Sequence, residues 1–71
     1  MTRRPKSAAR LRALLDELGL SQMDAARLLR RGPRSVRRWV SGEAEPPFAE
    51  LALLELMVAY DVRPKWLEEL E

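Results

Sequence analysis

Glycine and proline divide this 71-residue chain into short segments, and these breaks limit the folds open to it. The glycines are Gly19, Gly32 and Gly42, and two prolines stand together at Pro46 and Pro47. Between the breaks, apolar residues recur every three or four positions, which is the spacing of an amphipathic helix. No segment shows the alternation typical of a strand. The sequence therefore predicts an all-α fold, a compact bundle of five short helices.

The ends of these helices can be predicted from the residues beside the breaks. We expect helices over about residues 8–18, 21–30, 33–41, 48–60 and 65–70. Ser7 is expected to cap the first helix, and Gly19 to follow its last residue in a left-handed conformation. Ser21 opens the second helix, with Asp24 in the position of a capping box. Pro33 suits the first position of the third helix, where its missing N–H is no loss.

The chain contains no cysteine and no histidine. This excludes disulfides and thiolate metal sites, and it removes the usual general base and the commonest metal ligand. We therefore expect a protein that is not an enzyme and that uses no cofactor or metal. No stretch approaches the roughly 18 apolar residues of a membrane span. The absence of cysteine fits a reducing compartment, so we expect a cytoplasmic protein.

Charge is distributed unequally along the chain. Residues 1–42 contain eleven Lys or Arg against three Asp or Glu, a net charge of +8, whereas residues 43–71 contain two against eight, a net charge of −6. Five arginines fall within the nine positions 30–38. Like charges repel, so this crowding predicts an anionic partner such as nucleic acid. The alternative is an ordinary solvated surface.

Two short helices joined at a glycine are expected within residues 21–41, which is the arrangement of a helix-turn-helix. Residues 19–42 read GLSQMDAARLLRRGPRSVRRWVSG. The diagnostic positions are Ser21, Gln22, Ala26, Leu29, Val36, Trp39 and Gly42. In these positions the segment resembles the Cro/C1-type (XRE-like) helix-turn-helix regulators of phages and bacteria. The resemblance covers about residues 8–60 and implies a lambda-repressor-like DNA-binding domain.

The resemblance also implies which side chains face inward and which face DNA. The expected structural core of the motif is Ala26, Leu29, Val36 and Trp39. The start of the third helix enters the major groove in this family, and the side chains predicted to reach base edges are Pro33, Arg34, Ser35, Arg37 and Arg38. Arg34 and Arg38 lie four residues apart on one helical face, and we expect them to read guanine O6 and N7. Contacts to phosphate alone remain the alternative for these arginines.

The predicted phosphate contacts lie at helix ends and in a basic N-terminal arm, residues 1–6. They are Gln22, Arg30, Arg31, Ser41, Arg3, Arg4 and Lys6. The arm could equally be a tail without contacts.

The turn between the second and third helices departs from the family pattern. A glycine usually follows the second helix, but here Arg30 and Arg31 come first and the glycine is Gly32. Either Arg30 adopts a left-handed conformation, which costs about 1 kcal/mol or more, or the turn takes another path.

Residues 7–71 are expected to form one domain, with a C-terminal dimerisation segment over about residues 48–71. That segment holds more apolar residues than one small core needs, and a domain this short is marginally stable alone. The predicted dimer interface is Leu53, Leu56, Met57, Tyr60, Trp66, Leu67 and Leu70. The alternative is that Trp66 and Leu70 fold back over the domain itself.

Together these features predict a sequence-specific double-stranded DNA-binding regulator. We expect a homodimeric autorepressor of the phage or mobile-element type that occupies a palindromic operator. One alternative is a protein-interaction module, such as an antitoxin or adaptor, that binds a partner protein through its acidic C-terminal half. Another is a nucleic-acid binder without sequence preference, which would show no large gap between an operator and random DNA.

Overall fold

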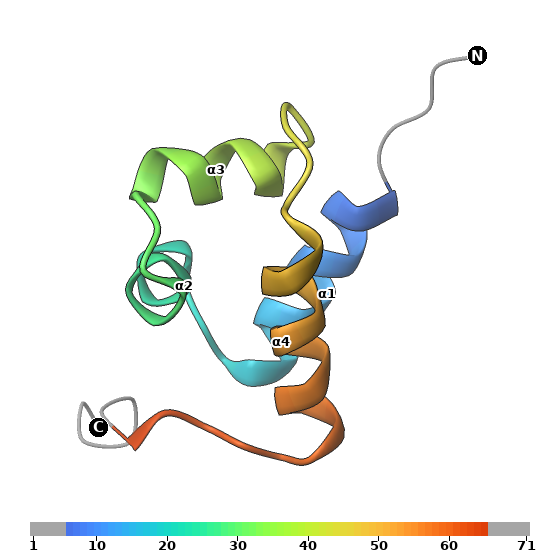
Figure 1. Cartoon of the computed structure of the whole chain (residues 1–71), viewed down its shortest axis with the longest axis vertical. Coiled ribbons are helices and arrows are strands. Elements are labelled where there is room, and N and C mark those ends of the chain that lie inside the picture. The colour runs from blue at the N-terminus through green and yellow to red at the C-terminus, as the bar shows by residue number, and fades with distance from the viewer. Residues whose placement is uncertain (1–5, 66–71) are drawn as a thin grey trace.

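The computed structural model describes residues 6–65, which form four helices and no strand (Figure 1). The helices are α1 (Lys6–Leu18), α2 (Gln22–Leu29), α3 (Pro33–Ser41) and α4 (Phe48–Ala59). The predicted all-α class is confirmed over this part of the chain. The predicted fifth helix, at residues 65–70, falls almost wholly outside the described residues, so the structure contributes four helices to the fold.

The start of α1 differs from the prediction. The helix begins at Lys6, so Ser7 lies inside its first turn and is not the N-cap. Capping propensity favoured Ser7, but Pro5 is the residue that suits the beginning of a helix, and nothing between it and Ala8 interrupts helical geometry. The other end agrees with the prediction, since α1 stops at Leu18 and Gly19 has a φ of 71°.

The predicted cap of α2 is confirmed as a reciprocal capping box. The Ser21 hydroxyl accepts a hydrogen bond from the Asp24 backbone N–H at 3.0 Å, and the Asp24 carboxylate accepts one from the Ser21 N–H at 3.2 Å. Two of the donors that a helix N-terminus leaves unpaired are thereby satisfied. The capping box therefore sets the start of α2, the first helix of the predicted motif, at Gln22.

The turn after α2 resolves the question raised by its two arginines. Arg30 adopts the left-handed conformation, with φ 58° and ψ 42°, and the Arg31 backbone N–H donates to the Ala26 carbonyl at 3.0 Å. The turn therefore closes as a glycine turn would, with an arginine in the strained position. Gly32 follows in an extended conformation as the N-cap of α3, and Pro33 is the first residue of that helix.

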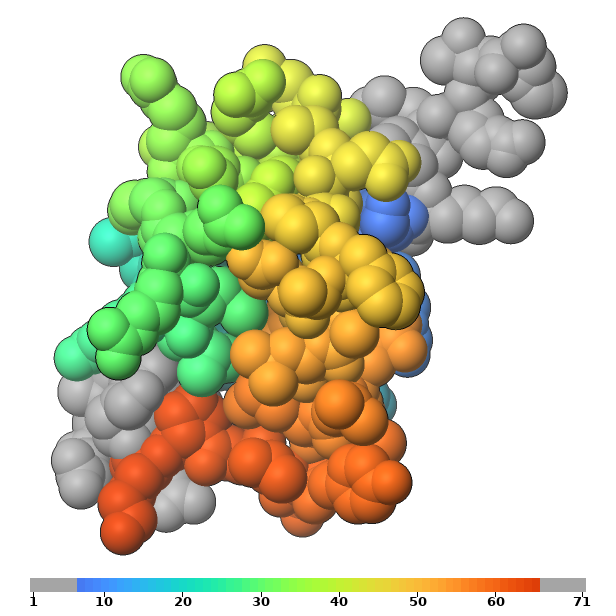
Figure 2. Space-filling view, in the orientation of Figure 1, coloured from blue at the N-terminus to red at the C-terminus, as the bar shows by residue number. Residues whose placement is uncertain are grey.

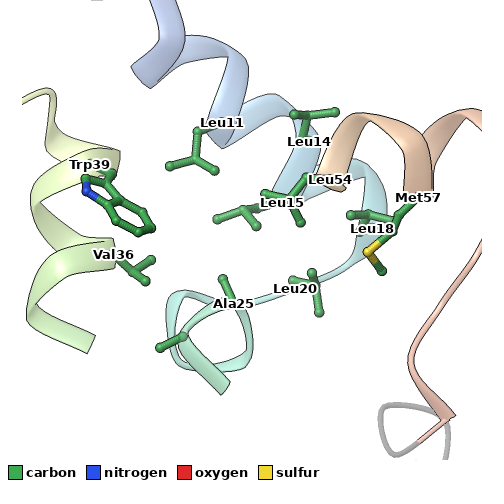
Figure 3. Packing of buried hydrophobic residues seen from close by; sticks show 11 residues of the cluster. Leu11, Leu14, Leu15, Leu18, Leu20, Ala25, Val36, Trp39, Leu54 and Met57 are labelled. Carbon is green, nitrogen blue, oxygen red and sulfur yellow. The ribbon is translucent and has the colours of Figure 1, made fainter. Parts of the chain in front are cut away.

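The core lies where α1 meets both α3 and α4 (Figure 3). On one side of α1, Leu11 and Leu15 face Val36 and Trp39 of α3. On the other side, Leu14 and Leu18 of α1 pack with Leu54 and Met57 of α4, and Leu20 and Ala25 close the space beneath. Because α1 contacts both partners, it holds α3 at a fixed position relative to α4.

Met57 corrects one prediction about the dimer interface. Only 6% of this residue is exposed, and it belongs to the core of the domain itself. The apolar pattern of residues 48–60 covers most of the helix circumference, so the sequence alone could not separate inward from outward positions. Leu53, Leu56 and Tyr60, by contrast, are exposed on α4 or directly after it.

Candidate nucleic-acid interface

Helix α3 separates its apolar and basic side chains cleanly. Val36 is fully buried and Trp39 is 6% exposed, and both point toward α1 (Figure 3). Arg34, Arg37 and Arg38 are exposed on the other sides of the helix. This follows from the spacing of 3.6 residues per turn, which places residues 36, 39 and 40 on one face. The helix therefore presents a basic surface to solvent while its opposite side is fixed in the core.

The exposed arginines border a single open hollow. Its lining residues are Arg34, Arg37, Arg38, Ser41 and Glu43, from α3 and the start of the following loop. Four of the five can donate hydrogen bonds, and three are positively charged. Such a surface attracts an anion, and it has the donor groups that pair with phosphate oxygens or with guanine O6 and N7.

The arginines on this surface differ in how they are held. Within residues 6–65, neither Arg34 nor Arg37 forms an ion pair. Arg38 lies 3.8 Å from the Glu43 carboxylate, measured from its Nε, and both side chains are more than half exposed. A pair so long and so hydrated contributes little to stability, so Arg38 can exchange it for another anion at small cost.

The other two predicted base-contacting residues occupy the N-terminal turn of α3. Pro33 is exposed at the first helical position, and Ser35 is half-buried one turn before Trp39. Pro33 offers only an apolar surface. The structure therefore brings Pro33, Arg34, Arg37 and Arg38 to the outside of one short helix, with Ser35 less accessible than its neighbours.

Both the position and the C-terminus of α3 are held by contacts that the sequence did not predict. The Arg12 side chain reaches from α1 and donates to the Val40 carbonyl at 2.7 Å. The Ser41 hydroxyl donates to the Arg38 carbonyl at 3.1 Å and accepts from the Glu43 backbone N–H at 3.3 Å. Gly42 ends the helix with a φ of 88°. No local sequence signal indicates the Arg12 contact, because its partner is a backbone carbonyl 28 residues away.

The residues predicted to contact phosphate are spread over three places. Gln22 is exposed at the first position of α2, and Arg30 is exposed in the turn. Ser41 lines the hollow on α3, but its hydroxyl proton is already used within the helix end. Arg31 points elsewhere: its Nε donates to Glu50 on α4 at 2.7 Å. Arg3, Arg4 and the Lys6 side chain lie outside the described residues, as do Trp66, Leu67 and Leu70 of the predicted dimer interface.

Comparison with protein families identifies this arrangement. Residues 8–70 match the model of a helix-turn-helix domain family. The chain belongs to this helix-turn-helix family. Neither the curated proteins nor the solved structures contain a match to the chain.

In helix-turn-helix domains the second helix of the motif is the recognition helix, and in this chain α2 and α3 take the places of the two motif helices. The domain is of the kind that binds double-stranded DNA, and membership indicates a DNA-binding regulator. The match includes the acidic C-terminal part as well as the motif, so α4 belongs to the same domain as α3. Within residues 6–65, no helix has both the length and the apolar character needed to cross a membrane.

Proposed function

We propose that this helix-turn-helix protein is a sequence-specific regulator of the Cro/C1 type that acts as a dimeric repressor by occupying an operator. The observation that carries the proposal is the outward face of α3, where Arg34 and Arg37 are exposed and unpaired among residues 6–65. Because Val36 and Trp39 fix the opposite face in the core, the arginines are presented on a rigid element. A helix-turn-helix domain bound at an operator can block a promoter by occupancy alone.

Base readout is assigned to Arg34 and Arg38. They lie four residues apart and border the same hollow, and a bidentate arginine–guanine pair discriminates by roughly 1–3 kcal/mol. Arg37 borders the same hollow and reads a base or holds a phosphate. Pro33 and Ser35 complete the surface that meets the groove, with Pro33 placed to touch a thymine methyl group.

Phosphate contacts are assigned to Gln22, Arg30 and the basic arm. The Asp24 carboxylate already occupies the N-terminus of α2. The Gln22 amide, rather than the free helix end, is therefore the donor to phosphate. Arg30 projects from the turn in a left-handed conformation without an ion pair among residues 6–65. Residues 1–6 supply further positive charge that follows the backbone or enters a minor groove.

Dimerisation is assigned to the exposed apolar side of α4. Phe48 is 84% exposed and Leu56 is 56% exposed, and both border an apolar groove together with Leu51, Ala52, Glu55 and Ala59. Exposed large apolar side chains concentrated on one helix mark an interaction site. In Figure 1, α4 runs away from α3, so two copies joined through α4 would leave the α3 helix of each copy free to contact DNA. Leu53 and Tyr60 are the further contacts of this interface.

Selection from a random pool of duplex DNA tests the proposal. The expected product is a palindromic motif whose half-sites lie about one helical turn apart, centre to centre. A salt titration on the selected duplex and on a scrambled duplex then separates specific from general binding. Both affinities fall with salt, but only a regulator shows a gap of roughly a thousandfold or more between them. Equal affinity for every duplex would contradict the proposal.

The exposed apolar groove on α4 also supports one alternative function. An antitoxin or adaptor would use the same surface to bind a partner protein, with DNA binding in a secondary role. Sedimentation of the purified chain separates the two. A dimer formed by the chain alone favours the repressor, whereas a monomer with weak DNA binding favours the interaction module.

A further inference from the structure

One charged contact ties the turn of the motif to α4. The Arg31 Nε donates to the Glu50 carboxylate at 2.7 Å, which makes it the shortest of the three ion pairs found in residues 6–65. The Glu50 side chain is only 15% exposed, whereas the acidic partners Glu55 and Glu43 are 45% and 65% exposed. The Arg31 side chain is 46% exposed, so the shielding comes from the Glu50 side, where the carboxylate is largely withdrawn from water and its charge-assisted hydrogen bond is stronger than one to a fully hydrated carboxylate.

The Arg31 guanidinium also lies against α3. Its Cζ lies 5.9 Å from the centre of the Trp39 ring, within the range of a cation–π interaction. Trp39 is the core tryptophan on the inner face of α3. Arg31 therefore joins three parts of the molecule: the turn by its backbone, α3 through Trp39, and α4 through Glu50.

Arg31 lies directly before α3 in the chain, so its contacts affect how α3 is oriented. Its backbone N–H closes the turn on the Ala26 carbonyl at 3.0 Å, and only Gly32 separates it from Pro33, where α3 begins. The residue before it, Arg30, has a positive φ of 58° that an L side chain does not favour. A turn that is strained in this way keeps its shape only while surrounding contacts hold it.

We propose that Arg31 and Glu50 are a positioning pair that sets the orientation of α3 for base readout, and that Arg31 is not a phosphate contact. This inference rests on the proposed function, since it names residues that tune the same DNA-binding surface. Base-edge hydrogen bonds require arginines placed within about half an ångström of the productive geometry, so a shift of α3 affects specific binding first. General attraction to phosphate is long-ranged and tolerates such a shift.

The two roles for Arg31 predict opposite effects of removing Glu50. If Arg31 contacted a phosphate, Glu50 would compete for its guanidinium, and Glu50→Gln would strengthen binding. If the pair positions α3, Glu50→Gln weakens binding to the selected duplex. Removing any acidic charge also raises affinity for all DNA, so a matched control is required. Glu17 supplies it, because it is exposed on α1, forms no ion pair within residues 6–65 and lies outside both proposed binding surfaces.

The experiment measures the affinity of the full chain for its selected duplex and for a scrambled duplex. Glu50→Gln is expected to lower the ratio of the two affinities roughly tenfold, while Glu17→Gln changes that ratio less than about twofold. Arg31→Gln is expected to lower the ratio by a similar factor and to leave the slope of log affinity against log salt unchanged. Arg63→Gln is its control, because Arg63 is exposed beyond α4 and forms no ion pair within residues 6–65. Thermal unfolding of each variant shows which ones are folded at the assay temperature.

A second variant covers the case in which Glu50→Gln does not fold. Glu50→Asp keeps the charge but draws the carboxylate back by one methylene group, and it should lower the ratio in the same direction by a smaller factor. An unchanged ratio in the folded Glu50 variants, or a salt slope reduced by about one in Arg31→Gln, would overturn the positioning role. If the unmodified chain itself selects no sequence, the proposed function fails instead, which keeps the two failures distinct.

Discussion

At the scale of single residues, the most unusual position is Arg30, which holds a conformation that glycine adopts freely. Arg30→Gly is expected to raise the free energy of unfolding by about 0.5–1 kcal/mol. Relief of about 1–2 kcal/mol of left-handed strain outweighs the entropy cost of glycine, which is roughly 0.5–1 kcal/mol. Denaturant unfolding followed by circular dichroism measures the change. Arg37→Gly is the control, because it lies exposed inside α3, where glycine should instead destabilise by about 1 kcal/mol.

Single arginines on α3 also decide between reading bases and holding phosphates. Arg34→Ala and Arg38→Ala should each relax the preference at one base position per half-site by roughly 1–3 kcal/mol, because each would remove one of the proposed bidentate pairs with guanine. Affinity measured on a set of single-base variants of the selected duplex reports this. A loss of equal size on every duplex, with a salt slope lower by about one, would instead indicate phosphate contacts. Arg63→Ala, an exposed arginine beyond α4, should leave the preference unchanged.

At the scale of helices, the described elements could be predicted wherever a local signal marked their ends. Gly19, the Ser21–Asp24 box and Pro33 act through their own backbone neighbours, and each has the predicted place in the structure. The start of α1 was misplaced because the N-cap preference of serine does not tell whether Ser7 precedes the helix or lies in its first turn. The burial of Met57 and the Arg31–Glu50 ion pair could not be predicted from the sequence, because both depend on how α4 is rotated against the rest of the domain.

The two serines near helix starts give a direct test of these element boundaries. Ser21→Ala should lower the free energy of unfolding by about 1 kcal/mol, because it leaves the Asp24 N–H of the α2 capping box without its acceptor. Ser7→Ala should have no such cost, since Ser7 lies within the first turn of α1 and alanine is the better helix former. Denaturant unfolding of both variants checks this, and a comparable loss for Ser7→Ala would show that α1 begins where the sequence indicated.

At the scale of the whole molecule, the unequal charge distribution is partly compensated inside the fold. Arg10 and Arg31 come from the basic half and pair with Glu55 and Glu50 on α4. These contacts use acidic side chains to hold the basic helices in place, while the exposed arginines of α3 stay available. The basic surface that we propose binds DNA therefore consists of arginines that these two ion pairs do not use.

The proposed dimer can be tested at the apolar groove of α4, which a single copy of the domain leaves exposed. Leu56→Asp places a charge in the apolar groove of α4, where burial against a second copy would remove it from water without a partner. Sedimentation should therefore show a monomer, and affinity for a two-half-site duplex should fall toward that for a single half-site. Met23→Asp alters an exposed apolar residue on α2, away from α4, and should leave the dimer intact. If Leu56→Asp remained dimeric, the contact between copies would have to lie outside the α4 groove, and the two reading helices would then be spaced by a different element.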